Sequence, residues 1–202
     1  MRRIVCLFCL FALLPVFVRA QNAEPKKAGV LIVYYSDKGH TKAMAEAVAK
    51  GAGAVDGATV TLLDVATAKP EDVLAADAVI VGSPVYKANV APKVQEFINS
   101  WPIKEARLHD KLGSAFASGS GLSAGEELVQ TSILHSMLVC QMIVVGGPGA
   151  GQPFGASAMD EDPSDGANTQ KPDGLVAEHY LMKGEALGKR VAELAVRLKN
   201  AK

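Results

Sequence analysis

The fold is decided by the stretch from Val30 to Thr41, which reads VLIVYYSDKGHT. Its first half is continuously apolar and rich in β-forming residues, which predicts a strand covered on both faces. A polar turn follows, and we expect a helix to open there with Thr41 as its N-cap. A buried strand that leads directly into a helix is the first half of a β-α-β unit.

The same alternation recurs along the chain. Further strands are expected over 59–65, 78–81, 112–117 and 142–145, and further helices from Pro92, from about Ala124 and from Leu175 onward. Parallel strands need a crossover between them, so this rhythm predicts an α/β domain over 28–202, with a five-stranded doubly wound parallel sheet and helices on both faces. The stretch 146–173 is dense in Gly, Pro and Asp and is expected to be a long loop.

The first twenty residues stand apart from this domain. Two arginines precede an apolar run from Ile4 to Val18, and small residues at Val18 and Ala20 suit cleavage by a signal peptidase. An apolar run of this length is shorter than the roughly 17 to 25 residues that cross a bilayer. We therefore expect residues 1–20 to be a signal peptide, the protein to be exported as a periplasmic or secreted protein, and no stable membrane insertion after cleavage.

Composition narrows the classes of function. The chain has 202 residues, 49% of them hydrophobic, which suffices for one core. Removal of residues 1–20 takes away three of the 21 basic residues and none of the 21 acidic ones, leaving a net charge of −3, which disfavours nucleic acid as a partner. Cys140 is the one cysteine beyond the leader and is expected to be a buried structural thiol, and the scattered histidines form no zinc pattern.

Three loops at the carboxyl ends of predicted strands are candidates for a ligand site, because ligands of open α/β sheets bind there. The loop 36–41 brings hydroxyls and a glycine to a helix N-terminus, which favours a phosphate, although it lacks the ending of a nucleotide P-loop. The loop 82–89 carries an aromatic residue and a cation, and the loop 118–123 is almost entirely backbone and hydroxyl. Together they suit a flat ring that bears a phosphate tail.

Several separated motifs make the chain resemble the WrbA family of flavodoxin-like NAD(P)H:quinone oxidoreductases, from about Val30 to Asn200. The motifs are Tyr34-Tyr35-Ser36, Gly39-His40, Gly82-Ser83-Pro84, Ser118-Gly119-Ser120-Gly121, His135-Ser136-Met137 and Pro153-Phe154-Gly155-Ala156-Ser157. The resemblance implies strand order 2-1-3-4-5, FMN as cofactor, NAD(P)H as co-substrate, a small-molecule quinone as acceptor and a homo-oligomer, dimer or tetramer.

The resemblance also assigns site residues by position. The FMN phosphate would be held by Ser36, Asp37, Lys38, Gly39, His40 and Thr41. The isoalloxazine would be lined by Val85, Tyr86, Lys87 and Asn89, and would receive backbone hydrogen bonds from Ser118, Gly119, Ser120, Gly121 and Leu122. His135 would lie near the flavin as a catalytic residue over the quinone site. The implied mechanism passes a hydride from the nicotinamide to flavin N5, after which the quinone takes two electrons.

Two sets of residues depart from that family, and two other functions stay open. Lys38 replaces an aromatic residue, and Val85-Tyr86-Lys87 replaces Thr-Arg-Phe, on the side expected to meet the nicotinamide.

One alternative function is therefore that of an FMN-binding electron carrier without nicotinamide-dependent turnover. The other is a serine hydrolase on Ser123, because Gly121 to Gly125 matches G-x-S-x-G. Trp101 is interpreted as a core residue that continues the preceding helix.

Overall fold

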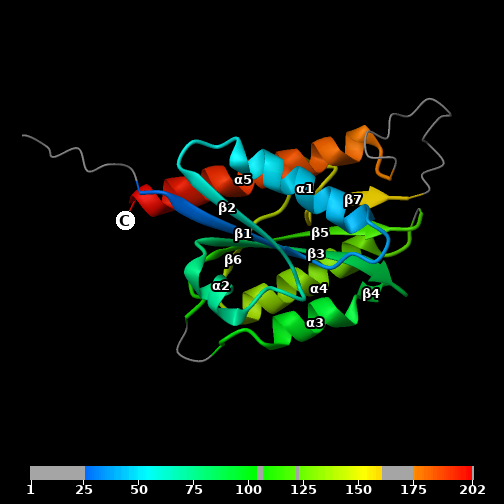
Figure 1. The fold of residues 1–202 in the computed structure, drawn as a ribbon, viewed down its shortest axis with the longest axis horizontal. Coiled ribbons are helices and arrows are strands. Elements are labelled where there is room, and N and C mark those ends of the chain that lie inside the picture. The colour runs from blue at the N-terminus through cyan, green and yellow to red at the C-terminus, as the bar shows by residue number, and fades with distance from the viewer. Residues whose placement is uncertain (1–25, 104–106, 122, 161–174, 202) are drawn as a thin grey trace, which may run out of the picture.

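A parallel sheet forms the middle layer of the structure, with helices on both of its faces (Figure 1). The structure is a computed structural model that describes residues 26–103, 107–121, 123–160 and 175–201. Its elements in chain order are β1 Ala28–Tyr34, α1 His40–Gly53, β2 Ala58–Asp64, α2 Pro70–Ala75, β3 Ala78–Tyr86, β4 Asn89–Val90, α3 Pro92–Asn99, β5 Leu112–Gly119, α4 Glu126–Val139, β6 Ile143–Val144, β7 Ala156–Met159 and α5 Glu178–Ala201.

The strand order confirms the predicted doubly wound topology. The main path runs β2-β1-β3-β5-β6, and β1 pairs in parallel with both β2 and β3, with Ile32 opposite Leu62 on one side and Ile80 on the other. The first strand in the sequence is therefore near the centre of the sheet. The crossover after it reverses direction relative to the crossover after β3, which is where such sheets bind ligands.

The fifth position of the sheet differs from the sequence-based expectation, because two short strands share it. β6 pairs with the start of β5 at Leu112 and Gly113, and β7 pairs with its end from Phe116 to Gly119. The predicted strand 142–145 is thus only two residues long, and part of the predicted loop 146–173 is a strand. Val145 follows β6, and Gly146, Gly147 and Pro148 come next; proline has no N–H to continue a ladder.

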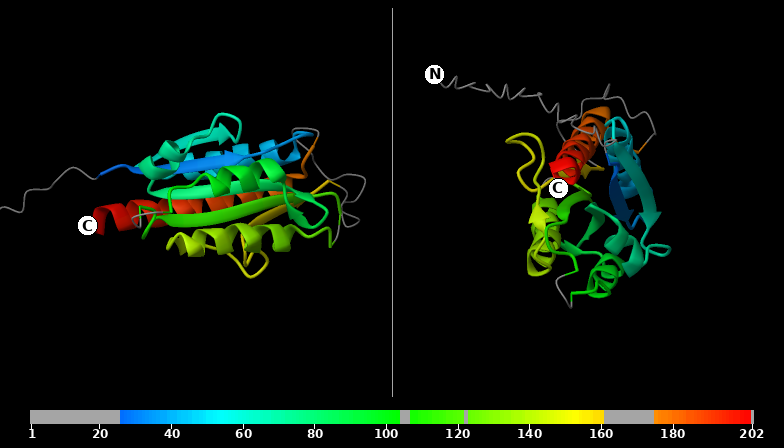
Figure 2. Two further views of the ribbon diagram at one scale, coloured as in Figure 1. Left: turned by 90° about the horizontal axis from the view of Figure 1, so that it is seen from below. Right: turned by 90° about the vertical axis from the view of Figure 1, so that its left-hand side faces the viewer.

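Alternate residues of the central strands pack into two separate hydrophobic cores, one on each face of the sheet. Val30 and Ile32 of β1 pack beneath α1 and α5, where Met44 and Leu187 are fully buried. Leu31 and Val33 point to the opposite face, which α2, α3 and α4 cover. The two views of Figure 2 show these helical layers on either side of the sheet. The unbroken apolar run of β1 follows from this burial on both faces.

Helices α1 and α5 meet at backbone distance. A Cβ atom at Gly188 would lie 1.9 Å from the carbonyl oxygen of Val48, and one at Gly51 would lie 1.9 Å from that of Glu185. Both positions therefore require glycine for reasons of space, although neither has a positive φ. The contact places α5 directly beside α1, the helix that follows the predicted phosphate loop.

Several local features were predicted differently or not at all. Helix α2 was not expected, and α3 ends at Asn99, so Trp101 lies beyond the helix that it was predicted to continue. Trp101 is nevertheless buried, with its ring edge-on to Phe97 at 5.8 Å, as expected of a core residue. Cys140 is buried as predicted, and burial raises the pKa of its thiol.

Two negative findings concern the described residues alone. None of the described helices combines the length and the apolar character needed to cross a membrane. Within the same ranges, no group of three or more His, Cys, Asp or Glu side chains is arranged to hold a metal ion.

Candidate functional site

The loop between β1 and α1 forms a hydroxyl-lined cradle at the start of a 14-residue helix. Gly39 is the N-cap, with a φ of 98°, and its N–H donates to the Ser36 hydroxyl at 3.1 Å. The prediction that Thr41 is the N-cap is wrong, because Thr41 is the second residue of α1. The left-handed turn at position 39 starts the helix earlier, because glycine adopts that conformation without steric cost. The N–H groups of the first turn are left without helical partners, as an anion requires.

The Thr41 side chain has a different role, because it crosses to the end of β5. Its hydroxyl lies 2.8 Å from that of Ser118, and both side chains are buried. Ser118, Gly119 and Ser120 then border the same cavity as the first loop. Of the other residues predicted in this third loop, Gly121 does not line the cavity and Leu122 lies outside the described residues.

The second loop is shorter than predicted, since β3 continues to Tyr86 and turns back into β4. Tyr86 pairs with Asn89 across a tight turn in which Lys87 and Ala88 have φ values of 52° and 62°. Pro84, Val85 and Tyr86 line the cavity. Lys87 and Asn89 are exposed at the tip of the hairpin, where the Asn89 amide donates to the Lys87 carbonyl at 2.8 Å, and they do not line it.

These three segments enclose a cavity of about 250 Å³ beyond the carboxyl ends of β1, β3 and β5. It is lined by Ser36, Asp37, Lys38, His40, Thr41, Pro84, Val85, Tyr86, Ser118, Gly119, Ser120 and Asp160. Most of the residues predicted for the site are thereby brought together. The possible hydrogen-bond donors are hydroxyls, the N–H groups at the start of α1, the Lys38 ammonium and the His40 imidazole. This set of donors suits a phosphate.

Asp160 is a site residue that sequence reasoning missed. It follows β7, and its N–H donates to the Gly119 carbonyl at 3.0 Å. Its carboxylate lies 3.5 Å from His40 Nε2. Two acids, Asp37 and Asp160, thus border a cavity fitted for an anion, and the pairing with His40 neutralises one of them when the imidazole is protonated. The only sequence signal was its place in a long polar stretch.

An aromatic wall closes one side of the cavity. The ring of Tyr86 meets that of Tyr35 edge-on, with centroids 6.3 Å apart and planes at 85°. A hydrogen bond with Tyr35, burial and the neighbouring charges of Tyr35 and Asp37 raise the pKa of Tyr86 to about 12. The Lys93 ammonium lies 4.9 Å from the centre of the Tyr35 ring.

The structure does not bring His135 to this cavity within one chain. His135 is exposed on α4, about 14 Å along the helix axis from Glu126, the residue with which α4 begins. The predicted catalytic role of His135 stays a prediction. The motif around Ser123 is also poorly placed for a hydrolase: β5 ends at Gly119 and α4 begins at Glu126, whereas a nucleophile elbow joins strand to helix directly.

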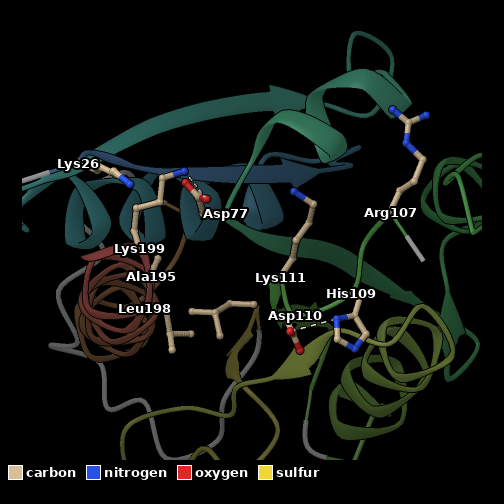
Figure 3. A pocket seen from close by; sticks show the side chains of 10 residues that line it. Lys26, Asp77, Arg107, His109, Asp110, Lys111, Ala195, Leu198 and Lys199 are labelled. Atoms are coloured by element: carbon tan, nitrogen blue, oxygen red, sulfur yellow. Dashed lines mark hydrogen bonds and ion pairs between the residues drawn. The ribbon is translucent and has the colours of Figure 1, made fainter. Parts of the chain in front are cut away.

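A second cavity, of about 340 Å³, lies at the opposite edge of the sheet, where the strands begin (Figure 3). Several of its charged groups take part in ion pairs or in hydrogen bonds to the backbone. Asp77 binds the Lys199 ammonium at 2.8 Å and the Gly29 N–H at 2.9 Å, and Lys111 donates to the carbonyls of Leu74 and Ala76. Figure 3 shows Lys199 directed at Asp77, with the pair of His109 and Asp110 further along the rim. This cluster ties the last helix to the sheet.

The parallel sheet and the polar cavity at its switch point define a flavodoxin-like protein. A family model described as Flavodoxin domain matches residues 31–134. Two curated relatives, from Chromohalobacter salexigens and Geotalea uraniireducens, are both named NAD(P)H dehydrogenase (quinone). They are 30% and 32% identical to the chain, and each match covers 84% of this chain and 98% of the relative. The chain therefore belongs to the family of flavodoxin-like NAD(P)H dehydrogenases (quinone).

Solved structures agree with this fold. The WrbA-like flavodoxin from Agrobacterium tumefaciens superposes with a TM-score of 0.67 at 24% identity, covering 85% of this chain and 99% of that one. A flavodoxin from the domain Archaea superposes with a TM-score of 0.63 at 23% identity, covering 83% and 98%.

Proposed function

We propose that the cavity at the switch point binds FMN and that the protein uses it to carry electrons from NAD(P)H to a quinone. The observation that carries the proposal is the buried hydroxyl pair of Thr41 and Ser118. It joins the helix N-terminus suited to a phosphate with the donor-rich end of β5, so one elongated ligand could contact both. The names of the two relatives support the nicotinamide and quinone assignments.

Each part of the cavity then has a role toward that ligand. Ser36, Thr41 and the N–H groups of the first turn of α1 would hold the phosphate, with Lys38 adding positive charge. Val85 and Tyr86 would face the ring system, and Ser118 to Ser120 would donate to its polar edge and to the ribityl chain. FMN itself supplies the acceptor of hydride and the store of two electrons. The protein would hold FMN in position and would provide the polar groups around it.

A flavin-loading experiment tests this proposal. The chain from Gln21 onward, and the full chain in parallel, would be mixed with FMN, freed of excess and followed by visible absorption as NADH is added without oxygen. Retained yellow flavin that NADH bleaches is the expected result. Retained flavin that only dithionite bleaches would make the protein an electron carrier. Failure to retain flavin would refute both functions.

We also propose that residues 1–20 direct export and are then removed, so that the protein works outside the cytoplasm. The support is the sequence of the leader, with two arginines before an apolar run. N-terminal sequencing of protein recovered from the periplasm or the medium should start at Gln21. Recovery of the protein in the cytoplasm with its leader intact would refute the proposal.

A further inference from the structure

The backbone of Tyr86 is fixed at the rim of the cavity. Tyr86 ends β3 and pairs with Asn89 of β4, and Val85 pairs with Val90 in the same short ladder. The N–H of Ala91, just beyond the ladder, donates to the buried Ser83 hydroxyl at 3.0 Å. The side chain of Tyr86 remains 38% exposed, so the ladder alone would leave its ring free to change rotamer.

A second tyrosine restrains that ring. Tyr35 follows β1 directly and is half-buried, and its ring stands edge-on to Tyr86, the favourable geometry for two aromatic rings. Interaction with the Tyr35 side chain is also the largest of the causes that raise the pKa of Tyr86.

A lysine restrains the second tyrosine in turn. Lys93 is the second residue of α3, behind Pro92, and its ammonium lies over the face of the Tyr35 ring at 4.9 Å. A cation at this distance is attracted by the negative face of the ring. The loop after β1, the end of β3 and the start of α3 thus each contribute one side chain to a single assembly at the rim.

We propose that Tyr35 and Lys93 are positioning residues that hold the Tyr86 ring as a fixed wall of the cavity and thereby strengthen its binding of a flat ring ligand. The inference rests on the proposed function, since FMN is that ligand. An exposed aromatic side chain that must be ordered on binding reduces affinity, and ordering it beforehand recovers roughly three- to ten-fold.

The test uses Tyr35→Phe and Lys93→Met, with Lys93→Arg as the conservative replacement and Lys189→Met as a matched lysine change on α5. Without FMN, the ionisation of Tyr86 is followed up to pH 11 by NMR of tyrosine labelled at the ring carbon that bears oxygen. Wild-type Tyr86 should stay largely protonated, and Tyr35→Phe should let it ionise near the ordinary value of about 10. Contacts between the rings of residues 35 and 86 should weaken in Lys93→Met.

FMN affinity is measured on the same proteins by quenching of flavin fluorescence. Tyr35→Phe and Lys93→Met should each weaken binding roughly three- to ten-fold, whereas Lys93→Arg and Lys189→Met should match wild type. Equal affinity in all the variants, or ordinary ionisation of wild-type Tyr86, would overturn the positioning roles. If wild type binds no FMN, the proposed function fails, while the NMR measurement still decides whether Tyr35 and Lys93 fix the ring.

Discussion

The Thr41 and Ser118 hydroxyls lie 2.8 Å apart although 77 residues separate them in the sequence. Thr41 belongs to the first turn of α1 and Ser118 to the end of β5, and β3 runs between β5 and the strand that precedes α1. The pair therefore joins two segments that meet only because the sheet is doubly wound. Both hydroxyls are buried, so each depends on the other for a hydrogen-bond partner.

Removal of the Thr41 hydroxyl should weaken FMN binding without unfolding the protein. Thr41→Val keeps the shape of the side chain but leaves Ser118 without this partner, and we expect about a ten-fold loss of FMN affinity, or about 1.4 kcal/mol. Titration of flavin fluorescence checks it. Thr131→Val, an exposed hydroxyl change on α4, serves as the control and should leave affinity unchanged. An equal loss in both variants would contradict the role of the pair.

Two glycines of the α1 and α5 region should respond in opposite directions to alanine. Gly188→Ala would force a Cβ against the Val48 carbonyl and should lower the free energy of unfolding by about 2–4 kcal/mol. Gly53→Ala meets no atom within 4 Å at the end of α1 and should raise it by about 0.5–1 kcal/mol. Urea unfolding of both variants is the measurement, and a Gly188→Ala variant as stable as wild type would show that the two helices are not in backbone contact.

The ion pair of Asp77 and Lys199 should make stability depend on acid pH. Burial alone would raise the pKa of Asp77, but hydrogen bonds from Lys199 and Gly29 and the charges of Lys199 and Lys111 hold it below its ordinary value. A carboxyl whose pKa is lowered by folding stabilises the fold above its unfolded pKa of about 3.9, and that contribution is lost as pH falls through the folded value.

Asp77→Asn therefore should cost about 1–2 kcal/mol at pH 7, at the low end because the Lys199 side chain is 36% exposed. The difference in the free energy of unfolding between Asp77→Asn and wild type should shrink as pH falls below about 4. Urea unfolding at a series of pH values measures it, with Lys199→Met expected to show the same trend. A difference that stays constant from pH 7 to pH 3 would mean that the charge of Asp77 contributes nothing.

The hairpin turn after β3 should be improved by a residue that tolerates a positive φ. Lys87 and Ala88 both have positive φ values in a two-residue turn, where Asn-Gly is the preferred sequence. Lys87→Asn is expected to stabilise the protein by about 0.5 kcal/mol. Lys189→Asn, in the interior of α5, should instead destabilise slightly, because asparagine is a poorer helix former than lysine. Thermal unfolding distinguishes the two signs.

The sequence predicted most of the fold because its signals are local. The apolar run of β1, the turn at Gly39 and the proline at the start of α3 each act on their immediate neighbours. Contacts between distant segments left no such trace. The pairing of Thr41 with Ser118 and the approach of Asp160 to His40 depend on the sheet topology. β7 was missed because three of its four residues, Ala156 to Ala158, are small and the strand lies in a stretch dense in glycine.

The interruption of the fifth strand has a consequence for how separate copies of the protein meet. On that side of the sheet, β6 offers two residues and β7 four, and the chain leaves the ladder between them. A long, flat border would be a template on which the strand of another molecule could add, with aggregation as the result. A border broken into such short pieces gives an incoming strand little to pair with, so this side of the sheet resists growth into fibres.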